Sequence, residues 1–449
     1  MSGLSIRYFV LGTLLLGLAA TGCESPAARF RMNMAFKRKQ ERINLTSRDG
    51  EKETVGQLST GQVQDIANIL AFLFGTPDDP RMPPVGEVDS SKFVNLKLVK
   101  MAAGPVLSSQ QGHPQGLYRE HCVHCHGITG DGAGPTAGFL NPYPRDYRRG
   151  LFKFKSTKKG AKPTHEDLKR IVLEGVAGTA MPSFKLLPDQ EVESLVHYVR
   201  YLAIRGEVER KLIELAATDL APADAKTEPT RFYKQPIDKA ELKTQLTPYN
   251  ELAQEVIATW VNPAAVPIPA PGKRDAAGKL LAPTDATKFV SVDLQRENQV
   301  SIARGRELFY GPVANCFSCH GDSGLGDGQK DFYDEWSGEW VEKIDPHGKI
   351  KGEYIALGAL PPRNLLPRNL RYGVYRGGRR PIDLYWRIVN GIDGAQMPAA
   401  PMKPDDAGPE VKGLTNQDVW DLINYVLSLP YETISHPAIP ESHMIKEQL

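Results

Sequence analysis

The sequence predicts an all-α protein in which two copies of one helical domain follow each other along the chain. Four sequence blocks recur in the same order in the two halves, neither copy shows the two-residue period of a strand, and the first block of each copy contains the motif C-x-x-C-H. The blocks are LYREHCVHCHG, PRDYRRGLFKF, DLKRIVLEGVAGTAMP and EVESLVHYVRYL in the first copy, and RELFYGPVANCFSCHG, PRNLRYGVYRGG, DLYWRIVNGIDGAQMP and DVWDLINYVLSL in the second. The domains are expected at residues 101–205 and 295–435.

The N-terminus has the pattern of an export signal. Arg7 precedes an apolar stretch, Tyr8–Ala20, which is too short to cross a bilayer and is interpreted as part of a signal peptide over residues 1–22. The run LAATGC, which ends at Cys23, resembles a bacterial lipobox, so Cys23 is the expected lipidation site. The mature chain is then expected in the cell envelope, on the periplasmic side, with a lipid anchor in a membrane. Ordinary secretion with an incidental Cys23 is the alternative.

Further helices are expected outside the two copies. Residues 23–100 form an N-terminal extension, in which Val63–Phe74 has helical apolar spacing. Residues 206–294 form a largely helical or irregular inter-domain segment, with helical patterns at Glu207–Ala216 and Asp238–Val261 and a linker rich in Pro and Ala at Asn262–Pro283. Residues 436–449 form a C-terminal tail.

Each copy is expected to end in a helix with one apolar face. In the first copy Pro188 precedes this helix, and the face consists of Val192, Leu195, Val196, Val199 and Leu202. In the second copy Thr415 and Asp418 predict a capping box, and the face consists of Val419, Leu422, Ile423 and Val426.

The cysteines indicate the chemistry. Four of the five cysteines lie in the two C-x-x-C-H motifs, so a disulfide framework is not indicated. In this motif two thiols add to the two vinyl groups of a haem, and the adjacent histidine becomes an axial ligand of the iron. The residues concerned are Cys122, Cys125 and His126 in the first copy and Cys316, Cys319 and His320 in the second. The sequence therefore predicts two covalently bound haem c groups.

Other functions fit less well. A zinc site would combine the two cysteine pairs, yet each pair has its own following histidine and its own repeat. A thioredoxin-like dithiol would need strands around the motif, which neither copy predicts. Nucleic acid is not an expected partner, because 55 basic and 53 acidic residues leave a net charge of only +2. No phosphate loop, paired carboxylate site or nucleophile triad stands out.

A methionine is the expected second axial ligand in each copy. Met181 and Met397 each precede a proline, follow a glycine-containing turn and stand before the final helix. A thioether is a soft ligand that favours Fe(II). A methionine more often serves in packing, but two Met-Pro pairs at matching repeat positions favour ligation. Met402 competes with Met397 for the second iron, and one of several histidines could instead make the first haem bis-His: His113, His121, His124, His165 or His197.

Both copies resemble the class I cytochrome c domain. The resemblance implies an N-terminal helix, the C-x-x-C-H motif, a Met-Pro loop and a C-terminal helix that crosses the first. It further implies that Pro135 provides the carbonyl to which the proximal histidine donates, whereas the second copy has no obvious counterpart and carries an insert at Trp336–Ile355. The small and aromatic residues of the family's helix crossing resemble Gly305, Leu308, Phe309 and Tyr425 in the second copy and Leu117 and Tyr118 in the first.

Basic residues lie between the motif and the methionine in both copies. Arg145 and Arg368, each after a proline, are the best candidates for pairing with haem propionates, which need compensation when partly buried. The alternative is a solvated face or a docking patch for an acidic partner. The complete set is Arg145, Arg148, Arg149, Lys153 and Lys155 in the first copy and Arg363, Arg368, Arg371 and Arg376 in the second.

These features predict an electron carrier rather than an enzyme. The expected reaction is one-electron cycling between Fe(III) and Fe(II), and the expected redox partners are a quinol-oxidising membrane complex and a terminal oxidase or reductase. By analogy alone, such a lipoprotein is similar to the small subunits of alternative complex III. The alternative is a haem enzyme subunit, of a peroxidase-like or reductase type, in which one haem has a labile ligand.

Overall fold

A computed structural model describes residues 27–43, 57–83, 94–110, 112–222, 227–234, 239–269, 272–274, 280–283, 299–333 and 349–437. The predicted signal peptide, the lipidation site Cys23, most of the insert after Trp336 and most of the C-terminal tail lie outside the described residues. The described chain is mostly helical, which confirms the predicted all-α class. Its strands form two short antiparallel pairs, β1–β2 and β3–β4.

The described residues before the linker hold eight α-helices. The elements of this first part are α2 (Met34–Ile43), α3 (Thr60–Phe74), α4 (Leu96–Ala102), β1 (Ser109–Gln110), β2 (His113–Pro114), α5 (Leu117–His121), α6 (Val123–His126), η2 (Ala137–Phe139), η3 (Tyr147–Arg149), α7 (His165–Glu174), α8 (Asp189–Ala217) and α9 (Lys239–Ala258). The expected helices at 63–74, 207–216 and 238–261 are thus present as α3, the end of α8 and α9.

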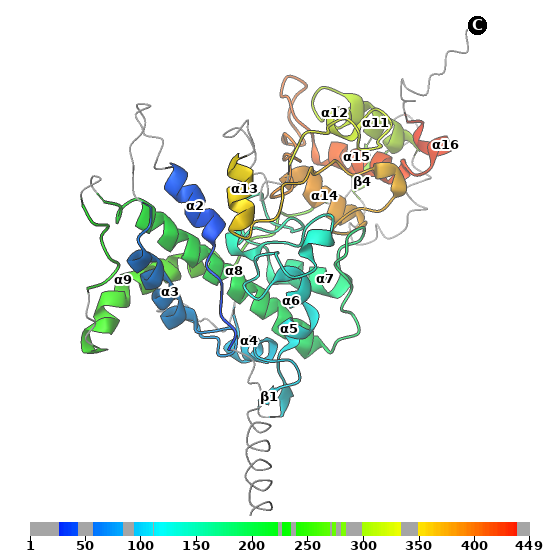
Figure 1. Ribbon diagram of the computed structural model, residues 1–449. Helices are drawn as coiled ribbons and strands as arrows, with labels where there is room; N and C mark the ends of the chain where they lie inside the picture. The colour runs from blue at the N-terminus through cyan, green and yellow to red at the C-terminus, as the bar shows by residue number, and fades with distance from the viewer. Residues whose placement is uncertain are drawn as a thin grey trace, which may run out of the picture.

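The second part repeats the order of the first. Its elements are β3 (Gly272–Arg274), β4 (Leu280–Pro283), α11 (Gln299–Tyr310), α12 (Phe317–His320), α13 (Lys349–Ala356), η6 (Leu370–Tyr372), α14 (Pro381–Asn390), α15 (Asn416–Ser428) and α16 (Glu432–Ser435). α12, η6, α14 and α15 correspond to α6, η3, α7 and α8. In Figure 1 the helices α11, α12 and α14 to α16 form a group apart from α2 to α9.

The crossing of α11 and α15 determines the shape of the second domain. Gly305 lies so close to α15 that a Cβ atom there would collide with the backbone carbonyl of Asp421. One turn further along, the rings of Phe309 and Tyr425 meet edge to face at 5.3 Å between centroids. Thr415 and Asp418 form the predicted capping box at the start of α15. The predicted helix crossing is therefore present.

The first domain makes the same crossing with a divided helix. α4 packs against α8, and the glycine- and proline-rich segment 103–116 then interrupts the helix before α5, because these residues cannot continue it. Tyr118 on α5 lies 4.8 Å from the ring of Tyr198 on α8. Its hydroxyl donates to the carbonyl of Gly127 at 2.9 Å. Tyr118 therefore corresponds to Phe309, as the repeat predicts.

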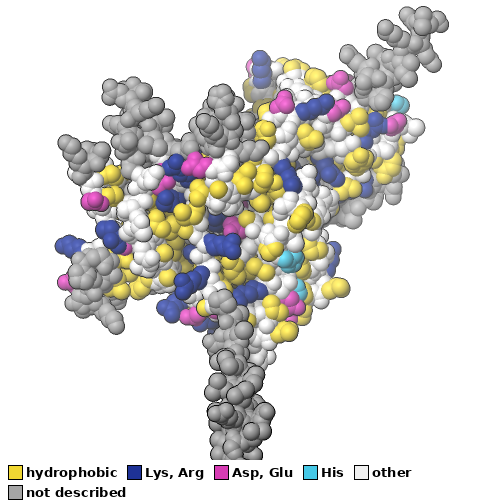
Figure 2. Space-filling model, viewed as in Figure 1, with side chains coloured by type: hydrophobic (Ala, Val, Ile, Leu, Met, Phe, Trp, Pro, Cys, Tyr) yellow, Lys and Arg dark blue, Asp and Glu magenta, His cyan; other side chains and the backbone are white. Residues whose placement is uncertain are grey.

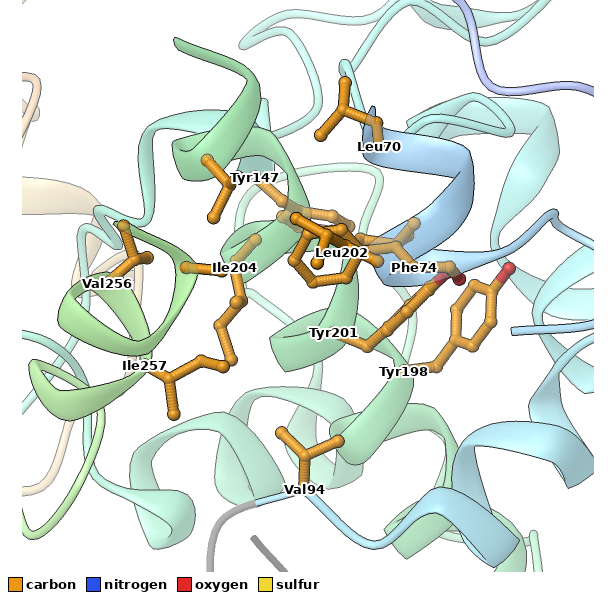
Figure 3. Close-up of a cluster of buried hydrophobic side chains, with 14 of the residues drawn as sticks. Leu70, Phe74, Val94, Tyr147, Tyr198, Tyr201, Leu202, Ile204, Val256 and Ile257 are labelled. Carbon is orange, nitrogen blue, oxygen red and sulfur yellow. The ribbon is translucent and has the colours of Figure 1, made fainter. Parts of the chain in front are cut away.

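A large core joins the first domain to the segments on either side of it. α8 runs for 29 residues, continuously across the predicted boundary between residues 205 and 206. The second half of α8 packs with α2, α3 and α9. Figure 3 shows this core, in which Tyr201 and Leu202 of α8 lie close to Phe74 of α3 and Tyr147 of η3. The N-terminal extension and the inter-domain segment are consequently part of this folded body.

Polar contacts fix the same segments in place. The buried carboxylate of Glu209 on α8 accepts from the backbone N–H of Asn33 at 2.7 Å and from Arg205 at 3.1 Å. On α3, the buried Asp65 pairs with Arg231 at 2.5 Å. α13, from the insert of the second copy, contacts α2 through an ion pair between Arg38 and Glu353.

The linker contacts both domains. The N–H of Val266 donates to the carbonyl of Ser156 at 2.9 Å, and the indole of Trp386 donates to the carbonyl of Val266 at 3.1 Å. Further along, Trp420 of α15 donates to the carbonyl of Pro269 at 3.1 Å. The predicted semi-extended linker is thus attached to both domains over its described residues.

No described helix is both long enough and apolar enough to traverse a lipid bilayer. On the face shown in Figure 2, basic and acidic side chains are interspersed among apolar ones.

Candidate haem sites

Each C-x-x-C-H motif forms one tight helical turn. α5 ends at His121, the chain bends at Cys122, and α6 then carries Cys125 and His126. In the second domain Cys316 begins the equivalent turn, α12. The N–H of His126 donates to the carbonyl of Cys122, and the N–H of His320 donates to the carbonyl of Cys316, both at 2.9 Å. Two thiols and an imidazole are thereby grouped within one turn in each domain.

The two histidines have matching hydrogen bonds. Nδ1 of His126 lies 3.1 Å from the carbonyl oxygen of Arg145, and Nδ1 of His320 lies 3.0 Å from that of Arg368. The expectation that Pro135 accepts this bond is wrong, and the second copy does have a counterpart of the accepting residue. In both domains it is the residue after the proline of the second block. Donation from Nδ1 fixes the tautomer that leaves Nε2 available for a metal.

Glycines bring the accepting carbonyl close to the histidine. The N–H of Gly132 donates to the carbonyl of His126 at 3.0 Å, and that of Gly326 to the carbonyl of His320 at 2.7 Å. Gly132 has φ +70°, and a Cβ atom there would lie 2.6 Å from the carbonyl oxygen of Pro144. A larger residue would therefore push the proline–arginine pair away from the histidine.

Burial keeps both histidines neutral. It lowers the pKa of His126 to about 4, although the carbonyl of Arg145 opposes the shift, and it also lowers the pKa of His320. The ring of His126 stacks on Tyr147 at 4.8 Å between centroids. Burial also raises the pKa of the Cys122 and Cys316 thiols to about 12. Both imidazoles are therefore buried and neutral, as a ligand to iron requires.

The two methionines lie in turns with the same backbone pattern. The N–H of Val176 donates to the carbonyl of Met181, and the N–H of Ile392 donates to the carbonyl of Met397, both at 3.1 Å. Each turn has two glycines with positive φ, Gly175 and Gly178 in the first and Gly391 and Gly394 in the second. Both methionines are half-buried.

The first Met turn is connected to the motif by the residues that follow it. The ring of Phe184, three residues after Met181, lies 5.8 Å from that of His121, the residue before Cys122. In the second domain Met402 has a different setting from Met397. It packs against the hydrophobic core and pairs with Leu414 in an isolated bridge. Met397, and not Met402, therefore shares the backbone setting of Met181.

Most of the basic residues between motif and methionine have partners in the protein. Arg148 pairs with Asp146 at 2.8 Å, and Arg371 pairs with Glu432. The buried Nε of Arg376 has no hydrogen-bond partner among the described residues. Burial and the nearby Arg368 lower its pKa. Two close guanidinium groups of like charge, one with an unsatisfied buried donor, fit the carboxylates of a haem.

From the sequence, Arg376 was named as one of the basic residues between motif and methionine, but not as one of the best candidates. The only available signal was its place in the repeat, where it aligns with Lys153. Arg145 and Arg368 were singled out for their side chains, whereas the structure also gives their backbone carbonyls a position at the histidines.

Two other histidines have partners away from the motif. His165 lies 2.8 Å from Glu193, and His197 accepts from the N–H of Asn95 at 3.2 Å. Their rings are 5.3 Å apart at the contact of α7 with α8. These hydrogen bonds indicate a structural role for both imidazoles at the contact of α7 with α8 in the first domain.

Fold and sites together define a tandem pair of class I haem-binding domains. Residues 110–199 match the family model described as "Cytochrome C oxidase, cbb3-type, subunit III", and residues 302–430 match the one described as "Cytochrome c". The chain thus contains two cytochrome c domains in tandem, and such domains imply haem binding and electron transfer.

More distant similarity adds no further detail. Among solved structures, a chain of the reducing HAO-like protein complex of Kuenenia stuttgartiensis is 21% identical, with 70% of this chain and 94% of that chain covered and a TM-score of 0.38, which is too distant to bear on function. No curated protein matches the chain.

Proposed function

We propose that this protein is a membrane-anchored electron carrier of the bacterial cell envelope that binds two haem c groups covalently. The thioether bonds would form at Cys122 and Cys125 and at Cys316 and Cys319. The axial ligands would be His126 with Met181 for the first iron and His320 with Met397 for the second. The observation that carries this proposal is the matched pair of histidines, each with Nδ1 bonded to an arginine carbonyl and Nε2 left for iron.

The residues of each site would suit reversible one-electron transfer. Bound haem supplies an iron that alternates between Fe(III) and Fe(II). The thioether ligands favour Fe(II) and raise the potential relative to a bis-His haem. Arg368 and Arg376, and Arg145 in the first domain, would compensate the haem carboxylates.

Location and partners are part of the same proposal. A lipid on Cys23 would anchor the mature chain on the periplasmic side of a membrane. There it would accept electrons from a quinol-oxidising complex and pass them to a terminal oxidase or reductase. Export agrees with the C-x-x-C-H motifs, because bacterial haem attachment of this type takes place outside the cytoplasm. Acid hydrolysis of the purified N-terminal peptide should release fatty acids, and an unmodified Cys23 would contradict the anchor.

The two haems are tested most directly by mass. The mature chain should keep two porphyrins after denaturation and acid extraction, and variants Cys122→Ala and Cys316→Ala should each weaken one attachment. A chain that weighs only its amino acids and any lipid would overturn the whole proposal.

The methionine ligands have a distinct spectroscopic signature. Ferric His/Met haem has a weak absorption band in the far red, here called the Met–Fe band. Met181→His and Met397→His should each remove about half of it, because each removes one of two thioether ligands. Met402→Leu is the matched control and should leave the band intact. Loss of half the band in Met402→Leu would assign the second ligand to Met402 instead.

The enzyme alternative predicts different behaviour. A haem with a labile sixth ligand would give a high-spin ferric signal and turnover with peroxide or nitrite. Two low-spin haems and no turnover would support the carrier.

A further inference from the structure

Both methionine turns lie where the two domains contact each other. The first Met loop is defined as residues 175–182 and the second Met loop as residues 391–398. The loops occupy equivalent positions in the repeat. Each is contacted by a basic side chain that belongs to the opposite domain.

The second Met loop is bonded to the first domain through Asp393. Oδ2 of Asp393 lies 2.7 Å from Nζ of Lys155, and Oδ1 accepts from the N–H of Gly160 at 3.0 Å. The side chains of Lys155 and Asp393 are only 3% and 4% exposed. Each charge is therefore removed from water and depends on the other for compensation.

The remaining donors of Lys155 are also satisfied within the first domain. Its Nζ donates to the carbonyl of Lys158 at 2.8 Å and to the carbonyl of Ala161. Burial lowers the pKa of Lys155, and the adjacent carboxylate of Asp393 opposes that shift. The ammonium group thus links the turn at residues 158–161 of the first domain to the loop that carries Met397.

The first Met loop makes the reciprocal contact. Gly178 has φ +71°, and a Cβ atom there would lie 2.8 Å from Nη2 of Arg368 and 3.3 Å from Cγ1 of Val374. The carbonyl of Arg368 accepts from His320, while Nε of Arg368 donates to the carbonyl of Val374 at 2.7 Å. Arg368 therefore contacts the histidine of the second site and the methionine loop of the first.

We propose that each Met loop is positioned by a basic residue of the opposite domain: Lys155 positions the second loop through Asp393, and Arg368 positions the first loop at Gly178. This inference rests on the proposed methionine ligation. Lys155 and Arg368 act here as positioning residues, because they act through the loops rather than as ligands. The properties of each iron site then depend on the domain that does not contain it.

The test isolates one iron site at a time in the full-length protein. In a Met181→His background the Met–Fe band reports only on Met397. Adding Lys155→Met, a change in the first domain, should reduce this band about twofold or more and lower the potential of the second haem, since outer partners of metal ligands affect metal binding about tenfold or more. Lys159→Met is the matched control, an exposed lysine of the same turn, and should change neither.

A double variant separates lost positioning from lost folding. Lys155→Met with Asp393→Asn removes both buried charges and keeps an oxygen for the N–H of Gly160, so most of the band should return. If Lys155→Met alone takes up no haem, recovery in the double variant still supports the pairing. An unchanged band and potential in both variants would overturn the role of Lys155.

The reciprocal test uses a Met397→His background, in which the band reports only on Met181. Arg368→Ala keeps the backbone carbonyl for His320 but should reduce the band of the first domain. Arg371→Gln is the control, because Arg371 pairs with Glu432 of its own domain. A band unaffected by Arg368→Ala would overturn this half. Absence of any Met–Fe band in both starting backgrounds would instead count against the proposed ligation itself.

Discussion

At the scale of single residues, the two domains reach the same contacts with different side chains. In the first domain the hydroxyl of Tyr118 donates to the carbonyl of Gly127. In the second the equivalent residue is Phe309, which has no hydroxyl, and the next residue, Tyr310, donates to the carbonyl of Asp322 instead. Both bonds connect the N-terminal helix to the loop after the motif. The contact is thus preserved although the donor has moved by one position.

Gly305 provides a prediction at this scale. Gly305→Ala should destabilise the second domain by roughly 1–3 kcal/mol, because the added methyl group collides with the carbonyl of Asp421 and α11 must move away from α15. The matched control is Gly352→Ala in α13, where a Cβ atom meets nothing within 4 Å. That change should be neutral or stabilising by about 0.5–1 kcal/mol. Thermal unfolding of the second domain distinguishes the two, and equal effects would contradict close packing at Gly305.

The residue scale also shows what sequence could predict. The C-x-x-C-H turns, the Met turns and the helix crossing follow from short motifs repeated at matching positions. The arginine carbonyls that accept from the histidines could not be predicted, because the contacts join residues 19 and 48 positions apart. Every residue has a backbone carbonyl, so the residue type does not indicate which carbonyl accepts a given bond, and only the folded structure shows it. The pair of Lys155 with Asp393 was hidden for a similar reason, since its partners come from different domains.

At the scale of elements, the two halves of α8 make different packing contacts. Its first half contains Tyr198 and completes the helix crossing of the first domain. Its second half carries Arg205 and Glu209, which contact the chain around Asn33. Sequence pattern predicted both halves as helical but separated them at residue 205. Nothing in the pattern shows whether two adjacent helical segments are joined, and the structure joins them into one helix.

The substitution Glu209→Ala tests whether the second half of α8 anchors the chain around Asn33. Glu209→Ala leaves the buried guanidinium of Arg205 without its carboxylate and should destabilise the first domain by about 3–5 kcal/mol. The N–H of Asn33 loses its acceptor as well, so cleavage by protease near residue 33 should become faster. Glu255→Ala is the control, because its pair with Lys211 is exposed and should contribute at most about 1 kcal/mol. Urea unfolding measures both, and a small effect of Glu209→Ala would contradict the anchoring role.

At the scale of the whole molecule, polar contacts join the two domains over several segments. Arg363 of the second domain donates to the carbonyls of Leu140 and Gly138 at 2.7 and 2.6 Å. Its guanidinium also lies 4.3 Å from the ring centroid of Tyr143, and Arg170 pairs with Asp383 at 3.2 Å. These contacts are directional and can be removed one at a time by substitution.

The substitution Arg363→Ala tests whether Arg363 joins the two domains. Removal of both donors should increase backbone hydrogen exchange in residues 138–143 and in residues 361–363. The first segment loses the donor to its carbonyls, and the second contains the substituted residue. Exchange in α3 should not change, since α3 lies in the core of the first domain. Increased exchange in only one of the two segments would show that Arg363 does not join the domains.

The length of α8 has a consequence for cutting the first domain out of this chain. The family similarity of the first domain ends at residue 199, in the middle of a helix that continues to Ala217. A fragment cut at that limit would lose Leu212 and Ile213, both completely buried, and would expose the apolar faces of α3 and α9 that they cover. The stretch that matches the family is therefore shorter than the stretch that packs as one folded body.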